Sequence, residues 1–174
     1  MNLKTSYFIH LHDIGCNQTY GDWLPYSFHL KAVAAQAKKF DMLLMLGMEY
    51  DESDVVEAAC YAHDSLEDAR LSYNDLLGVW ENKQFAREVA DIVYCLTDEK
   101  GKNRKERKND KYYEELAKNE LAVFVKLADI AANTLYSKLT GSDMYERYKK
   151  EFPRFKKKVY KEKYKAFFQY VESL

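Results

Sequence analysis

Apolar side chains recur at every third or fourth position along most of the chain, which is the spacing of one face of an α-helix. The pattern predicts helices over residues 3–14, 29–46, 53–63, 74–80, 84–96, 110–139, 143–152 and 155–171. Ser53 is expected to cap the third of these helices, and Pro153, which has no backbone N–H, to separate the last two. The polar stretches 17–25 and 98–108 are expected to be loops. The fold that follows is all-α, an irregular helical bundle.

The composition agrees with one helical domain. The chain has 174 residues, a length that one hydrophobic core can serve, and its 6 Gly and 2 Pro leave little room for a turn-rich β fold. No internal repeat, low-complexity linker or shift in composition divides the sequence. Residues 1–174 are therefore expected to form a single domain.

Cysteine usage and apolar runs indicate the compartment. Cys16, Cys60 and Cys95 are odd in number and lack close ligand spacing, which argues against a disulfide scaffold or a zinc knuckle. The first residues do not match a signal peptide, and no apolar run approaches the roughly 20 residues that span a bilayer. We expect a soluble protein of the reducing cytoplasm, without a membrane partner.

Charge is balanced overall but uneven along the chain. With 27 Lys and Arg against 28 Asp and Glu, a general nucleic-acid coat is not expected. Acidic residues dominate between Asp41 and Asp75, and basic residues between Lys100 and Lys111. The first run could hold a divalent cation and the second the phosphates that such a cation activates. Each run taken alone is more typical of a solvated helix face, and the Lys-rich end is interpreted as such a face above buried aromatic residues.

The candidate chemistry lies in one stretch, His63-Asp64-Ser65-Leu66-Glu67-Asp68, which follows an apolar helix. Neutral imidazole and carboxylate together are ligands of first-row transition metals. Glu67 lies four positions after His63, so its carboxylate would stand beside a bound ion and suit a general acid or base. A His-Asp pair by itself is more typical of a helix end at which the carboxylate accepts from the imidazole.

Other positions strengthen the metal hypothesis. His29 opens the long amphipathic helix, and Asp129 interrupts an otherwise apolar row. A buried carboxylate is costly without a cation or a hydrogen-bond network, and Asn133 lies one turn beyond Asp129 on the same face. His10 and His12 are expected to be partly buried or solvent-facing rather than ligands.

Taken in order, these residues resemble the HD-domain metal-dependent phosphohydrolases, and among them the hydrolase domains of the RelA/SpoT stringent-response proteins and their small stand-alone relatives. The resemblance extends over residues 3–150, and its combination of His-Asp-x-x-Glu-Asp with Lys-Leu-Ala-Asp-x-x-x-Asn is specific. The matching segments are Pro25 to Ala34, His63 to Ala69, Leu96 to Asp98 with Arg104 to Lys108, and Val125 to Asp129 with Asn133.

The resemblance implies a bundle of the HD-domain type and an enzyme whose substrate is a phosphorylated nucleotide. In this family one ion, usually Mn²⁺ with other divalent transition metals possible, assists removal of the 3′-diphosphate of guanosine tetra- and pentaphosphate. The metal ligands would be His29, His63, Asp64 and Asp129, and the catalytic carboxylates Glu67 and Asp68. The substrate-binding residues would be Asn133, Lys102, Arg104, Lys105 and an aromatic residue, Tyr145 or its neighbour Tyr148.

The sequence departs from the family where the base is recognised. Relatives carry an Arg-x-x-Gly segment whose guanidinium packs on guanine, and here Gln18-Thr19-Tyr20-Gly21 stands in its place. Gln cannot supply a cationic stacking plane, whereas Tyr20 could stack on a base or simply pack. Two alternatives therefore stay open. The metal site could act on another nucleotide, including NADPH or a nucleoside 5′-phosphate, or the domain could bind nucleotides without turnover.

Overall fold

The structure is a computed structural model that describes residues 3–41, 51–98 and 101–174, without the side chains of residues 51 and 52. Helices make up most of these residues, which confirms the all-α prediction, and the two strands found in them have two residues each. In chain order the elements are α1 (Thr5–His10), the π-helical turn η1 (Leu11–Gly15), β1 (Thr19–Tyr20), β2 (Leu24–Pro25), α2 (Ser27–Lys38), α4 (Asp51–Ala62), α5 (Tyr73–Val79), α6 (Lys83–Leu96), α7 (Arg104–Arg107), α8 (Asp110–Lys118), α9 (Glu120–Thr140), α10 (Met144–Val159), the 3-10 turn η2 (Glu162–Tyr164) and α11 (Lys165–Ser173).

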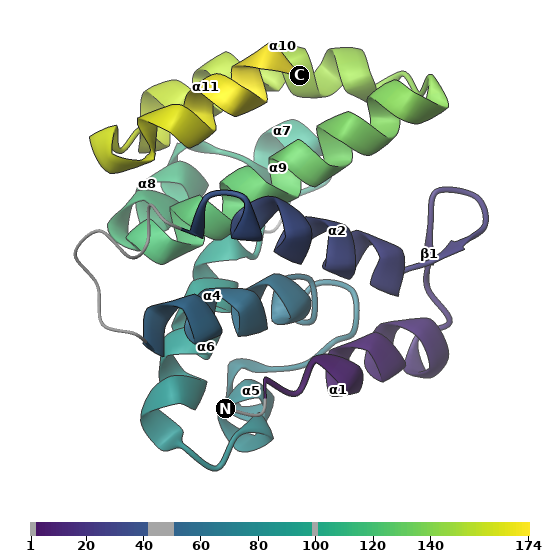
Figure 1. Cartoon of the computed structure of the whole chain (residues 1–174), viewed down its shortest axis with the longest axis vertical. Coiled ribbons are helices and arrows are strands. Elements are labelled where there is room, and N and C mark those ends of the chain that lie inside the picture. Colours follow the sequence, from purple (N-terminus) through teal and green to yellow (C-terminus); the bar gives the residue numbers. More distant parts are fainter. Residues whose placement is uncertain (1–2, 42–50, 99–100) are drawn as a thin grey trace.

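Helix α9 is the centre of the bundle. It packs against α2 on one side and against α10 and α11 on the other, and α4 and α6 complete the core below α2 (Figure 1). Its buried positions include Ala128, Ala131 and Ala132, whose small side chains let neighbouring helices approach closely. A helix with neighbours on several sides is buried around most of its circumference, so an ionic residue on α9 must find its partners inside the bundle.

Two helix boundaries differ from the prediction. The helix predicted over residues 110–139 is two helices, because Asn119 has an extended backbone and its side chain accepts from the backbone N–H of Ala122 at the start of α9. Pro153 does not end a helix but lies inside α10. Its ring is exposed while Phe152 and Phe155 beside it are buried, so aromatic packing offsets the roughly 3 kcal/mol cost of an internal proline.

Shorter segments also differ. Ser53 does not cap α4, which begins two residues earlier, and its hydroxyl donates instead to Asp41 at 2.9 Å. The predicted loop 17–25 contains the antiparallel pair β1–β2, and the loop 98–108 contains the single helical turn α7. The predicted helix 29–46 corresponds to α2, and its part beyond residue 41 lies outside the described residues.

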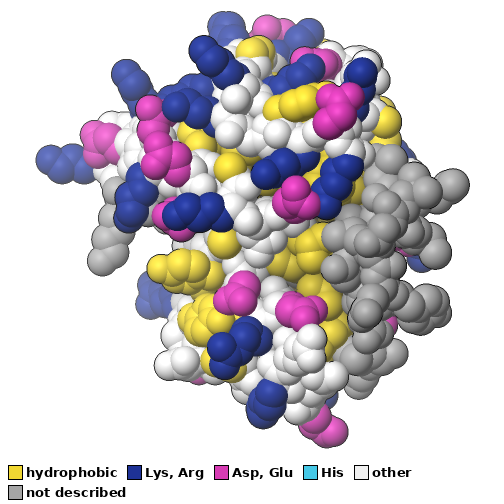
Figure 2. All heavy atoms as spheres, turned by 90° about the vertical axis from the view of Figure 1, so that its left-hand side faces the viewer, with side chains coloured by type: hydrophobic (Ala, Val, Ile, Leu, Met, Phe, Trp, Pro, Cys, Tyr) yellow, Lys and Arg dark blue, Asp and Glu magenta, His cyan; other side chains and the backbone are white. Residues whose placement is uncertain are grey.

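The Lys-rich end has the predicted arrangement of buried aromatic residues below basic ones, except that Tyr160 is exposed. Phe152, Phe155, Phe167 and Phe168 are buried, and Lys and Arg side chains cover α10 and α11 at the top of the molecule with acidic side chains between them (Figure 2). Several of these cations are paired, as in the 2.7 Å contact between Lys156 and Glu172. In the ranges that the structure describes, none of the helices combines the length and the apolar character needed to cross a membrane.

Candidate metal centre

Four side chains from three parts of the chain meet at one point. His29 lies in the first turn of α2, His63 and Asp64 directly follow α4, and Asp129 lies in the middle of α9. The Nε2 atom of His29 lies 3.2 Å from Nε2 of His63, 3.5 Å from Oδ2 of Asp64 and 3.4 Å from Oδ1 of Asp129. The Nε2 atom of His63 lies 2.8 Å from Oδ2 of Asp64 and 3.9 Å from Oδ1 of Asp129.

These separations fit a divalent transition metal. Ligand atoms about 2.1 Å from one ion stand roughly 3.0 to 3.4 Å apart in octahedral or tetrahedral geometry, which is close to the observed range. The Nδ1 atom of His63 lies 2.8 Å from the carbonyl of Cys60, and because a carbonyl only accepts, Nδ1 carries the proton and Nε2 is free to ligate. His29, His63 and Asp64 by themselves already form a group able to hold an ion.

Burial and charge act against each other in the centre. Burial alone would lower the pKa of His29, but its hydrogen bonds to Asp129 and Asp64 outweigh this and raise it to about 9. Burial alone would raise the pKa of Asp129, but Lys126 and the two imidazoles hold it well below its ordinary range. The ammonium of Lys126 donates to Oδ2 of Asp129 at 2.8 Å, and Oδ1, which accepts from the side chain of Asn133, lies toward His29. Asp129 is therefore an ionised ligand candidate with a fixed orientation.

The two predicted catalytic carboxylates face different surroundings. Glu67 lines a cavity together with His29, Asp64 and Asp129, and its Oε1 accepts from the backbone N–H of Asp98 at 2.6 Å. Burial raises the pKa of Glu67, as suits a group that exchanges protons. Asp68 is not among the residues found to line this cavity. Its Oδ2 accepts from Gln18 at 2.7 Å and from the hydroxyl of Tyr26 at 3.3 Å.

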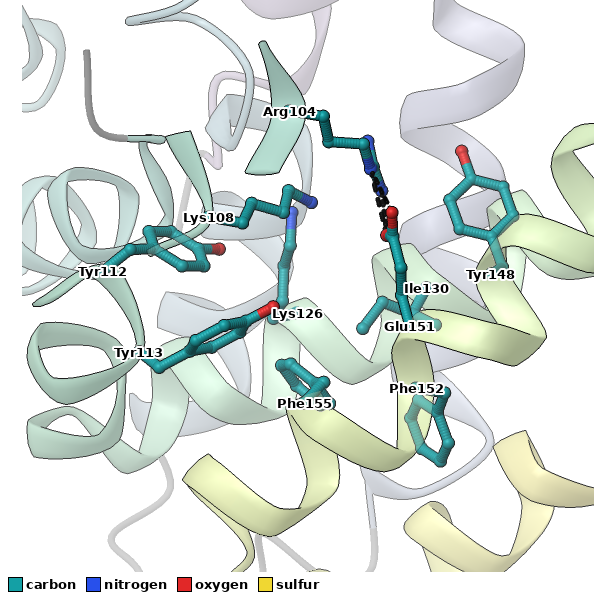
Figure 3. A pocket seen from close by; sticks show the side chains of 10 residues that line it. All are labelled: Arg104, Lys108, Tyr112, Tyr113, Lys126, Ile130, Tyr148, Glu151, Phe152 and Phe155. Atoms are coloured by element: carbon teal, nitrogen blue, oxygen red, sulfur yellow. Dashed lines mark hydrogen bonds and ion pairs between the residues drawn. The ribbon is translucent and has the colours of Figure 1, made fainter. Parts of the chain in front are cut away.

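The cavity has a volume of about 680 Å³, counting the part open to solvent, and part of its lining is basic. Arg104, Arg107 and Lys108 line it from α7 and the residue after it, and Lys126 lines it from α9. Lys108 and Lys126 point toward each other, whereas Arg104 makes a bidentate pair with Glu151 (Figure 3). Burial first, and then the nearby Lys126 and Arg104, lower the pKa of Lys108 to about 8. Cations are crowded together here as in an anion-binding site.

The structure places the predicted substrate residues unequally. Asn133 and Arg104 line the cavity. Lys102 and Lys105 are exposed and are not among its lining residues. Tyr145 is also absent from the lining, because its hydroxyl donates to the carbonyl of Leu174 at 2.9 Å. Its neighbour Tyr148, the other aromatic residue considered from the sequence, does line the cavity.

Tyr20, Tyr26 and Lys126 are site residues for which the sequence analysis predicts no definite role. The Tyr26 hydroxyl donates to Asp64 in a short hydrogen bond, and the Tyr20 ring stacks on His29 with 4.7 Å between ring centroids. Tyr20 also donates to Asn133 at 2.8 Å. Helical spacing could have indicated two of them, since Tyr26 precedes His29 by three residues and Lys126 precedes Asp129 by three.

Comparison with known proteins adds no family assignment. No protein-family model matches the chain. No curated protein matches it either. The functional conclusion therefore depends on the geometry of the centre and the sequence resemblance.

Proposed function

We propose that this protein is a metal-dependent phosphohydrolase of the HD-domain type, with Mn²⁺ as the ion and a phosphorylated nucleotide as the substrate. The nearest substrate class is guanosine 3′,5′-bis(diphosphate), from which the enzyme would release the 3′-diphosphate. The observation that carries the proposal is the convergence of His29, His63, Asp64 and Asp129 at a cavity that basic side chains also line.

The donor set and the position of Glu67 support hydrolysis by water. A divalent ion in the centre would make a water molecule more acidic and polarise a phosphate oxygen. Glu67 would take a proton from the attacking water. Its carboxylate lines the cavity and accepts from a backbone N–H, whereas the carboxylates of Asp64 and Asp129 accept from a hydroxyl and an ammonium. No covalent step on a Ser or Cys side chain is needed.

The basic wall supports a substrate with several phosphates. Arg104 and Lys108 would bind phosphate oxygens, and the Arg104 guanidinium would exchange Glu151 for a phosphate of similar bidentate geometry. Arg107 is held less tightly than Arg104, since its Nε lies 4.0 Å from Oδ2 of Asp98. Three cations on one wall can neutralise a diphosphate group.

The residues near the base position support a relaxed choice of base. Gln18 is engaged with Asp68, so it does not offer a free plane to a base. Tyr20 and Tyr148 line the cavity and are its aromatic side chains on the substrate side that could stack on a base, as Tyr20 already stacks on His29. Stacking on such faces is tolerant of base identity, so a nucleotide other than a guanosine derivative remains within the proposal.

The proposal is tested with purified protein loaded with Mn²⁺. We expect pyrophosphate to be released from guanosine tetraphosphate. The same assay is run with NADPH and with nucleoside 5′-mono- and triphosphates. If phosphate or pyrophosphate were released only from one of these other compounds, the protein would still be a phosphohydrolase, but with that compound as its substrate. A metal-loaded protein that releases nothing from any of them would overturn the proposal in favour of a nucleotide-binding module.

The pH dependence should report Lys108. Burial, and after it the neighbouring Lys126 and Arg104, favour loss of its proton, while Asp98 and Asp129 oppose it, and the resulting pKa is about 8. Lys108 is charged below that pH and neutral above it, so kcat/KM should fall as the pH rises from 7 to 9 because phosphate binding weakens. The Lys108→Arg variant keeps its charge over this range, and its kcat/KM should fall less. The exposed neighbour provides the control, since Lys105→Arg should retain the wild-type profile. Identical profiles for the wild type and Lys108→Arg would remove Lys108 from substrate binding.

A further inference from the structure

A chain of hydrogen bonds runs behind the metal centre. It begins at His12, a fully buried residue of η1, whose Nδ1 lies 2.7 Å from Oε1 of Gln18. Gln18 Nε2 donates to Oδ2 of Asp68 at 2.7 Å, and the same oxygen lies 3.3 Å from the hydroxyl of Tyr26, whose single proton it shares with the closer Asp64. Tyr26 in turn donates to Asp64. The chain therefore connects an N-terminal turn to a metal-ligand candidate 52 positions later in the sequence.

The chemistry of the partners fixes the orientation of each group. An ionised carboxylate only accepts hydrogen bonds, so Gln18 must turn its NH₂ group toward Asp68 and its carbonyl toward His12. A carbonyl also only accepts, so Nδ1 of His12 must carry the proton. The other nitrogen, Nε2, is buried and has no hydrogen-bond partner in the part of the chain that the structure describes. The His12 ring also stacks on Tyr26, with 4.9 Å between ring centroids and 23° between planes.

We propose that His12 and Gln18 are positioning residues that hold Asp68 and Tyr26 beside the metal ligands. This inference rests on the proposed function, because Asp68 matters only if a reaction takes place there. His12 holds the Gln18 amide in one orientation, and Gln18 holds the Asp68 carboxylate against the Tyr26 hydroxyl. A buried imidazole with one nitrogen unsatisfied destabilises the fold. The hydrogen bond from its other nitrogen holds the Gln18 amide in one orientation, and we assign His12 that role.

Kinetics of substitutions at Gln18 test the inference. The Gln18→Leu variant keeps the approximate volume and loses both hydrogen bonds. We expect kcat to fall about 10- to 100-fold, as for other residues that orient metal ligands, with KM within about twofold and Mn²⁺ content unchanged. An unchanged kcat overturns the proposal. In the Asp68→Asn background, Gln18→Leu should cause no further loss, because a residue that acts through Asp68 is not additive with it, and a full additional loss also overturns the proposal.

Substitutions at His12 separate positioning from packing. The Asn side chain can place a donor nitrogen where Nδ1 of the imidazole lies, so His12→Asn should keep most of the activity. His12→Leu fills the space without a donor, and kcat should fall as in Gln18→Leu. The matched control is His10→Leu, since His10 is exposed on the adjoining helix α1, and it should behave as the wild type. Equal activity of His12→Leu and His12→Asn would show that only packing matters and would overturn the proposal.

A spectroscopic readout keeps this inference distinct from the proposed function. Two-bond ¹H–¹⁵N correlation spectra of the intact protein should show a proton on Nδ1 of His12, and Gln18→Leu should change this pattern. A proton on Nε2, or an unchanged pattern in Gln18→Leu, overturns the inference whether or not the protein is an enzyme. A metal-loaded protein with the expected tautomer and no turnover of any nucleotide would instead overturn the proposed function.

Discussion

The Glu67→Gln variant should lose about two to four orders of magnitude in kcat, the range that a positioned general base contributes, while its Mn²⁺ content stays near one ion per chain. Gln has nearly the same shape as Glu, and its carbonyl oxygen can still accept from the backbone N–H of Asp98, a contact of 2.6 Å in the structure. What the variant lacks is a group that can take a proton. The two measurements are turnover of the compound that the wild type hydrolyses in the assay described above, and elemental analysis of the same preparation.

A matched substitution controls for the loss of one negative charge. Glu114 is exposed on α8, outside the cavity lining, so Glu114→Gln should keep the wild-type kcat. If Glu67→Gln were as active as this control, Glu67 would have no role in proton transfer. Loss of both metal and activity in Glu67→Gln would also contradict the prediction, because it would place Glu67 among the ligands.

The sequence was sufficient for the longer helices and insufficient for several boundaries, of which two are instructive. Apolar spacing reports which face of a segment is buried, and that information survives in the folded chain. It does not report a side chain that caps a helix in the middle of an apolar row, as Asn119 does. Apolar spacing also does not show that a helix can continue past a proline when aromatic residues on both sides are buried, as Phe152 and Phe155 are around Pro153.

The same contrast holds within the site. The four ligand candidates could be found because the ordered motif marks them, although 100 residues separate His29 from Asp129. The cavity-lining residues of the basic segment were harder to predict, because the sequence shows a run of cations and not the direction in which each side chain points. Once residues 104–107 form a helical turn, Arg104, Arg107 and Lys108 share one face by their spacing of three and four, and Lys105 lies on another. A one-turn helix is too short for apolar spacing to reveal.

Removing one ligand should abolish the response of the fold to metal. A ligand that binds only the folded state stabilises it by about 2.7 kcal/mol when its free concentration is a hundred times Kd. For a chain of this size, that energy raises the midpoint of thermal unfolding by roughly 5 to 10 °C. Mn²⁺ should produce this shift in the wild type and almost none in His29→Leu, because Leu offers no donor atom at the point where the four side chains meet.

The comparison has to be made within each variant, with and without Mn²⁺. The pKa of His29 is raised from 6.5 to about 9 in the metal-free fold, so its charged form stabilises that fold. This contribution is fully present below pH 6.5 and is lost as the pH rises through 9. His29→Leu is therefore expected to be less stable than the wild type at neutral pH even without metal, and only the shift caused by Mn²⁺ reports the site.

The exposed His10 supplies the control, because His10→Leu also removes an imidazole and should keep the wild-type shift. The sequence offers another place for a cation, the acidic residues that precede His63 in the run between Asp41 and Asp75. If Mn²⁺ stabilised His29→Leu as much as the wild type, the ion would bind there or elsewhere, and the convergence of two imidazoles and two carboxylates would be an internal ion-pair network. A shift that is lost in His29→Leu and kept in His10→Leu places the ion at the centre, since both variants retain the acidic run.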